Sequence, residues 1–156
     1  MREVMKAIRF EIDGEEKDFR ITKMNAFDGA YLMKIVTEKA LPLLQEAVTR
    51  TENETDSNAD LKMIGELGQR LLSSMDSVEL KKLMTICLQT VDMSYPAGYQ
   101  KVVDSRGNFG VSELEYDTAA CLRLVYEVVM FNCAGFFEGS GLSSLLAKAS
   151  GSQPAQ

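Results

Sequence analysis

The sequence predicts a mainly α fold of the α+β type: a helical domain of about four helices with a small N-terminal β-hairpin. Two observations carry this prediction. Apolar residues alternate with polar ones before residue 22, and they recur at helical spacing in several later stretches. Of the 156 residues, 46% are hydrophobic and 26% charged, which is typical of a globular chain that buries a core. We therefore expect one domain over residues 1–148 and a disordered tail over residues 149–156.

The hairpin is predicted over about residues 6–22. Apolar and polar residues alternate in 8–12 and again in 19–21, on either side of the turn signal formed by Asp13 and Gly14. An isolated two-stranded hairpin is only marginally stable in water. We therefore expect it to lie against helices, or against strands from another copy of the protein.

The first helix begins after Asn25, a residue suited to capping, and Asp28 is favourably placed in its first turn. Apolar residues then follow helical spacing along one face as far as residue 47. Pro42 lies inside this stretch and lacks a backbone donor. We expect a kink or a break there.

A polar segment, RTENETDSNAD at residues 50–60, separates the first helix from the second. It contains no large apolar residue and predicts a solvated linker, with disorder as the open alternative. A second, short helix follows over about 61–72, weakened by Gly65 and Gly68.

The third helix has the clearest start, because Asp76 and Glu79 resemble a capping box. Its apolar residues have the spacing of a helix with one buried face: Leu80, Leu83, Met84, Cys87, Leu88 and Val91. Residues 92–111 contain several turn residues between short apolar pieces and predict a loop that can include a second small hairpin.

The last helix is predicted to begin near Ser112 or Asp117 and to run to about Phe137. Between residues 122 and 133 its polar stripe is too narrow for a surface helix. It should be the central helix of the core, or be buried by another subunit.

Charge and composition exclude several functional classes. The net charge of −6 argues against general nucleic-acid binding, which needs a basic face. The sequence has neither a secretion signal nor an apolar run of about 18 residues, so we expect a cytoplasmic protein without membrane contact.

The sequence offers little for catalysis. It has no histidine, the commonest general base at neutral pH and the commonest metal ligand. Cys87, Cys121 and Cys133 stand in apolar contexts and suit packing. The acids between residues 113 and 117 suit a helix start, and Gly139 and Gly141 suit a helix end. We expect no enzyme, no cofactor and no metal site.

The order of segments resembles a known family. After the hairpin come ITKMNAFDGAYLMKIVTEKALPLL, a polar linker, SVELKKLMTICLQTV, and a last helix that runs into FNCAGFFEGSGLSSLL. This arrangement resembles the tail assembly chaperones of long-tailed, siphovirus-type bacteriophages and prophages. Its most recognisable part comprises Asn132, Phe136, Phe137 and residues 141–145. The ending after Lys148 departs from the family pattern.

The resemblance implies a largely helical, self-associating protein that binds the tape-measure protein, keeps it soluble and helps to recruit tail-tube subunits. It also implies absence from the mature virion. In many such proteins a ribosomal frameshift adds a second segment that contacts tube protein. The rival hypothesis is a structural head-to-tail connector or tail terminator that is retained in the virion.

Partner contacts are expected at methionines and aromatic residues off the predicted core faces, and at the apolar ending. Packing within the same subunit is the alternative for each of them. The candidate contact residues are Met24, Tyr31, Met33, Met63, Phe136, Phe137, Leu142, Leu145 and Leu146.

Overall fold

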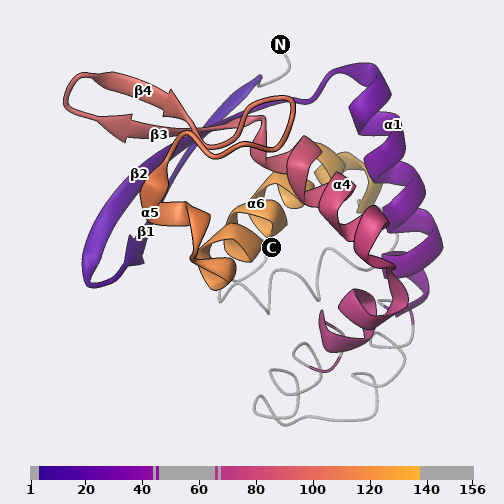
Figure 1. Ribbon diagram of the computed structural model, residues 1–156. Coiled ribbons are helices and arrows are strands. Elements are labelled where there is room, and N and C mark those ends of the chain that lie inside the picture. The colour runs from indigo at the N-terminus through magenta and orange to yellow at the C-terminus, as the bar shows by residue number, and fades with distance from the viewer. Residues whose placement is uncertain (1–3, 44, 46–65, 67, 138–156) are drawn as a thin grey trace, which may run out of the picture. The chain divides into compact units, whose positions relative to one another are not determined.

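The computed structural model describes residues 4–43, 45, 66 and 68–137 (Figure 1). The elements in chain order are β1 Met5–Ile12, β2 Glu15–Thr22, α1 Ala26–Ile35, the π-helical η1 Val36–Ala40, α4 Ser77–Leu88, β3 Val91–Tyr95, β4 Gly98–Lys101, α5 Ser112–Glu115 and α6 Thr118–Phe137. Residues 66 and 68–74 are also helical. The predicted linker at 50–60 and the tail at 149–156 lie outside the described residues.

The prediction of a helical domain with only a small hairpin is wrong, because the fold is mixed α+β. The hairpin is half of a four-stranded antiparallel sheet in the order β1-β2-β3-β4. β2 pairs with β3 from Phe19 opposite Met93 to Ile21 opposite Val91, and β3 continues into β4. The second hairpin, which the sequence suggested within the loop region 92–111, is present at 91–101 and completes the sheet.

The turn of the first hairpin has the expected geometry. Asp13 and Gly14 both have positive φ, 51° and 80°, as a two-residue type I′ turn requires. Glycine reaches this region without strain, and aspartate tolerates it better than most residues do. The turn fixes the register in which Ile12 lies opposite Glu15.

The chain forms two compact units. The sheet unit contains residues 4–30 and 78–132, and the helical unit contains the described residues of 31–77 together with 133–137. Within the helical unit the buried apolar residues are Leu32, Ile35, Val36, Met75 and Cys133. That residues 1–148 act as a single domain stays a prediction.

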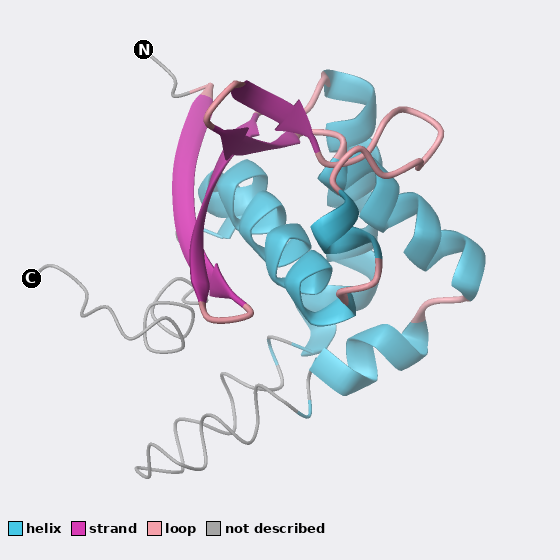
Figure 2. Ribbon diagram, turned by 60° about the vertical axis from the view of Figure 1, so that its left-hand side comes forward, coloured by secondary structure: helices cyan, strands magenta, loops and turns pink. Residues whose placement is uncertain are grey.

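In the sheet unit, α6 lies along one face of the sheet (Figure 2). Lys6 of β1 lies 4.0 Å from Glu127 of α6, and the Arg123 guanidinium lies 5.1 Å from the Phe10 ring centroid. The prediction that the last helix is a core helix is confirmed. Its buried residues within this unit are Ala120, Cys121, Leu124, Val125, Val128 and Phe131, and those of the sheet are Ile12, Phe19, Ile21, Val91 and Met93.

Two predicted caps are present. The Asp28 backbone N–H donates to Asn25 Oδ1 at 2.9 Å, and the Ala120 N–H donates to Asp117 Oδ1 at 3.0 Å. Each carboxylate or amide oxygen thereby satisfies an N–H in the first turn of its helix. Ser112 is the first residue of the short helix α5 and not the cap of α6.

The irregularity predicted at Pro42 lies in the turn before it. Residues Val36–Ala40 are π-helical, and the Leu41 N–H donates to the Val36 carbonyl. Proline offers no N–H for the next helical bond, so the backbone pattern must change near it. Residues 41–43 are again α-helical. The chain therefore has a π-helical segment before Pro42 and no break at it.

Candidate functional site

The thiols of the protein are buried and unoxidised. Cys87, Cys121 and Cys133 are all buried, and none of them forms a disulfide. Burial, with a smaller contribution from the charge of Asp117, raises the pKa of the Cys121 thiol. A raised pKa keeps a thiol protonated and therefore weakly nucleophilic. These cysteines pack the core, as their apolar surroundings predicted.

The acids near α5 are engaged in structural contacts. Lys17 Nζ lies 3.0 Å from Glu15 and 3.3 Å from Glu113, which ties α5 to β2. The hydrogen bonds that Lys17 Nζ donates to Glu15 and Glu113 raise the pKa of Lys17. Burial, together with the charge of Glu113, raises the pKa of Tyr95. Within the described part of the chain, no group of three acidic or cysteine side chains is arranged to hold a metal ion.

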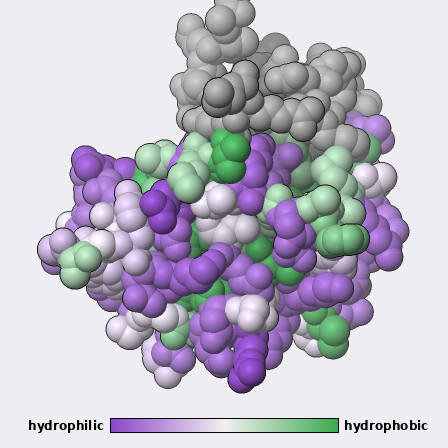
Figure 3. Space-filling view, turned by 90° about the horizontal axis from the view of Figure 1, so that it is seen from above, coloured by the Kyte–Doolittle hydropathy of each residue, from purple (hydrophilic) through white to green (hydrophobic). Residues whose placement is uncertain are grey.

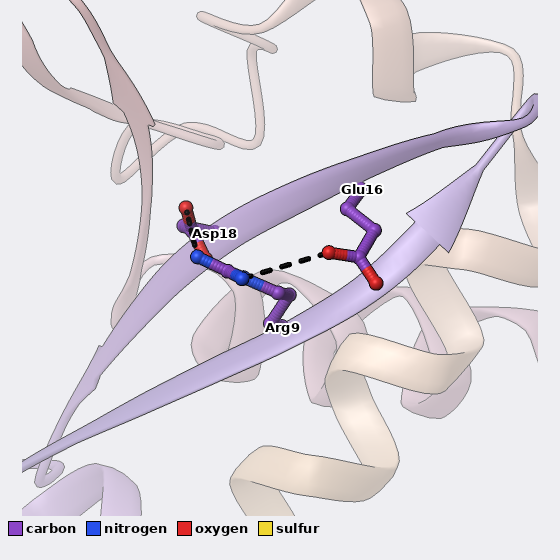
Figure 4. Close-up of polar contacts among 3 residues, drawn as sticks. All are labelled: Arg9, Glu16 and Asp18. Atoms are coloured by element: carbon purple, nitrogen blue, oxygen red, sulfur yellow. Dashed lines mark hydrogen bonds and ion pairs between the residues drawn. The ribbon is translucent and has the colours of Figure 1, made fainter.

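The outer face of the sheet carries charge pairs between neighbouring strands (Figure 4). Arg9 Nε lies 2.6 Å from Asp18 Oδ1, and Arg9 also lies 3.5 Å from Glu16. The hydrogen bond from Arg9 lowers the pKa of the Asp18 carboxyl. Further along β2, the Arg20 guanidinium contacts Asp92 at 3.0 Å and lies 3.8 Å from the Tyr99 ring centroid. The charged side chains of Arg9 and Arg20 are thus paired with acids of neighbouring strands.

The connection between β2 and α1 is held to α6 by a small polar cluster, which we call the Asn132 clasp. The Met24 N–H donates to Asn132 Oδ1 at 3.2 Å, and Asn132 Nδ2 donates to the Val128 carbonyl at 2.9 Å. Lys23 Nζ donates to the Phe131 carbonyl and lies 4.2 Å from the Phe131 ring centroid. Asn132, part of the most recognisable segment of the sequence, therefore has a structural role.

Replacing Asn132 with alanine should lower the free energy of unfolding by about 2 kcal/mol, because the part-buried Met24 N–H loses its acceptor. Asn132→Asp keeps that acceptor but replaces the donor to the Val128 carbonyl with a second acceptor oxygen, so we expect a loss of a different size from that of Asn132→Ala. Urea unfolding followed by circular dichroism measures both values. Equal losses in the two variants would contradict the assigned role of the acceptor.

Of the large hydrophobic side chains that the structure describes, the three most exposed belong to the sheet unit, and we call them the exposed apolar set. Phe27 is 89% exposed, Tyr116 89% and Val78 77%. Full burial of a side chain of this size stabilises a folded protein by about 1.5–3 kcal/mol, and these three side chains do not contribute that stabilisation. Figure 3 shows apolar surface as separate patches among polar residues on the face in view. Such side chains are candidates for contact with another polypeptide.

The structure describes the side chains of three of the contact residues predicted from the sequence. Met24, Tyr31 and Met33 are each half-buried, and Met33 Sδ lies 3.6 Å from Cys133 Sγ in the helical unit. Phe136 and Phe137 belong to α6, but their side chains lie outside the described part. Met63, Leu142, Leu145 and Leu146 also lie outside the described residues.

Sequence reasoning missed the exposed apolar set, although a signal existed. Val78 lies on the side of α4 that carries Lys81 and Lys82, opposite the core residues. Phe27 stands in the first turn of α1, before the buried stripe begins at Leu32. An apolar residue on the solvent-exposed face of a predicted helix is the pattern that would have indicated Val78 and Phe27.

Comparison with known proteins yields one finding. A family model described as a phage tail assembly chaperone protein, TAC, matches residues 14–144, most of the chain. Neither the curated proteins nor the solved structures give a match. Among the described helices, none has the length and apolar character needed to cross a membrane.

Proposed function

The chain belongs to the phage tail assembly chaperones, and on that premise we propose that it binds the tape-measure protein and keeps it soluble. It would also help to bring tail-tube subunits to that client during tail assembly. As a member of this family it acts in the host, while phage particles are built. We place it in the host cytoplasm, as a non-enzymatic homo-oligomer that is absent from the mature virion.

The observation that carries this proposal is the family match over residues 14–144. The physical properties expected of the tape-measure protein also support the proposal. A very long chain with exposed apolar stripes aggregates unless those stripes are transiently covered. Several weak apolar contacts made at once hold such a chain through avidity, without a deep groove.

We propose that the exposed apolar set supplies part of the client contact. Phe27 and Tyr116 present aromatic rings, the side chains that contribute most at protein interfaces. The half-buried Tyr31 and Met33 are further candidates, together with the remaining residues predicted from the sequence. Methionine suits such a surface because its flexible side chain adapts to varied apolar partners.

Co-expression with the tape-measure protein of the same phage genome tests the proposal. The client should be mostly insoluble when expressed alone, and soluble and co-purifying when the chain is present. An unrelated aggregation-prone protein expressed in its place should stay insoluble. A client that is equally soluble alone, with no complex recovered, would overturn the proposal.

The fate of the protein after assembly is a separate test. Quantitative mass spectrometry of purified virions should find the tube protein at full stoichiometry and this chain at trace level. Retention at a fixed copy number per particle would instead favour a structural connector or terminator.

A further inference from the structure

The two edges of the sheet differ in how they are protected. β4 is four residues long, and the chain beyond it is covered by the segment around residue 110, whose N–H donates to the Val102 carbonyl at 2.9 Å. A Cβ placed on Gly110 would lie 2.6 Å from the Lys101 carbonyl oxygen, so this segment packs directly on the strand end. β1 forms the other edge, with eight residues and an unbroken register. Long regular edges of this kind are templates for pairing with another strand.

The outward backbone groups of β1 belong to its odd-numbered residues. In a hairpin with a two-residue turn, Ile12 and Glu15 form a hydrogen-bonded pair, and such pairs recur at every second residue. The bond from the Lys23 N–H to the Val4 carbonyl fits this alternation. The backbone groups of Met5, Ala7, Arg9 and Glu11 therefore point away from β2. No backbone hydrogen bond joins them to any other residue that the structure describes.

The charged side chains of β1 can pair with those of a second, antiparallel β1 strand. Glu11 lies opposite Glu16, a like charge, and forms no ion pair with a described residue, while Arg9 faces two acids of β2. If a second β1 paired antiparallel with Phe10 on the two-fold axis, Arg9 would face the partner's Glu11, twice per dimer. Centring the axis on Arg9 or on Glu11 would instead set like charges against each other. Opposite charges in directly facing positions stabilise a sheet, and like charges destabilise it.

The apolar face of β1 fits the same arrangement. Ile8 and Phe10 point toward α6 but are only half-buried, whereas Phe19 on the neighbouring strand is fully buried. Pairing about Phe10 would place Ile8 beside the partner's Ile12 and the two Phe10 rings beside each other. Ile8 and Phe10 would then lose their remaining exposure to solvent, and this burial of apolar surface would stabilise the dimer.

We infer that two copies of this protein join through their β1 strands, antiparallel and centred on Phe10, to form one continuous eight-stranded sheet. The inference deepens the proposed function, on which it rests, by locating the self-association that was proposed there. The occupant of the edge is a second copy of this chain, because the charge pattern is self-complementary in one central register.

Charge reversal at Glu11 tests the interface. Glu11→Arg puts an arginine opposite the partner's Arg9 at both symmetric positions and should weaken the dimer roughly 30-fold. Glu115→Arg, the same charge change on the exposed end of α5, should leave the dimer unchanged. Sedimentation velocity over a concentration series measures both constants, and circular dichroism verifies that each variant is folded. A monomer at all concentrations, or equal effects of the two variants, would overturn the inference.

Cross-linking tests the register. Only a residue on the two-fold axis meets its own copy, at a Cα separation of about 4.5 Å that suits a disulfide. Phe10→Cys should therefore give an oxidised covalent dimer. Ile8→Cys, equally half-buried on the same face, should not, because it faces the partner's Ile12. Equal cross-linking of both variants would refute this register.

The two proposals fail in different ways. If Glu11→Arg is a monomer and the unaltered chain dimerises but leaves the tape-measure protein insoluble, the function is wrong and the β1 interface stands. If the chain solubilises its client while Glu11→Arg still self-associates normally, the function stands and the interface is wrong. Loss of client binding by Glu11→Arg with an unchanged dimer would show that a client strand, not a second copy, occupies the edge.

Discussion

Replacing Phe19 with alanine should lower the free energy of unfolding by about 4 kcal/mol, the largest stability effect expected for a single substitution in this chain. Phe19 is 1% exposed on β2, an inner strand of the sheet, and lies opposite Met93 of β3. Its ring is stacked on that of Phe10, with centroids 4.9 Å apart. Alanine would remove this contact and leave a cavity between the sheet and α6. Urea unfolding monitored by far-ultraviolet circular dichroism measures the loss.

Phe27→Ala is the matched control, because it removes the same atoms from a side chain that is 89% exposed. Its cost should stay below about 0.5 kcal/mol, as is usual for surface substitutions. A cost at residue 27 close to that at residue 19 would contradict the burial assigned to these two rings.

A variant with Phe27, Val78 and Tyr116 all changed to serine should remain folded and yet hold its client roughly tenfold more weakly. The three side chains contribute little to the core of the sheet unit, because each is at least 77% exposed. Their removal therefore separates binding from stability. The measured quantity is the amount of chaperone needed to halve the aggregation of tape-measure protein.

The control for this variant changes two exposed charged residues, Lys81 and Glu115, to serine without altering the net charge. It should match the unaltered chain in client holding. If the charged and the apolar variants lose holding equally, apolar contact is not what binds the client. If neither loses any, the contact lies elsewhere on the chain.

The sequence predicted those parts of the fold that are determined by residues close together in the chain. The turn at Asp13 and Gly14, the caps at Asn25 and Asp117, and the apolar stripe of the last helix all act within a few residues of chain. Each satisfies its own hydrogen bonds or packs one helix face. The sequence therefore predicted the first hairpin and the core helix.

The full sheet could not be predicted in the same way, because it depends on pairing between distant segments. β3 meets β2 across 72 residues of sequence, as Arg20 and Asp92 show. β4 spans four residues, all exposed, so it carries no alternation of apolar and polar side chains. Its strand conformation follows from its hydrogen bonds to β3 and not from its own residue preferences.

The candidate site was harder to predict than the fold, since periodicity shows which face of a helix is buried but not what covers the other face. Met24 and Met33 were expected at the surface because they fall off the core stripes, and each is half-buried. Asn132 gave no sign of its partner, the Met24 N–H, which is 108 residues away.

The decisive measurement is light scattering after denatured tape-measure protein is diluted into buffer that contains this chain at equal molar concentration. If the chain works by covering apolar segments of its client, scattering should be largely suppressed and a soluble complex recovered by gel filtration, with no nucleotide added. Scattering equal to that of the client alone, with this chain eluting from the column as it does without client, would contradict a chaperone role for the protein.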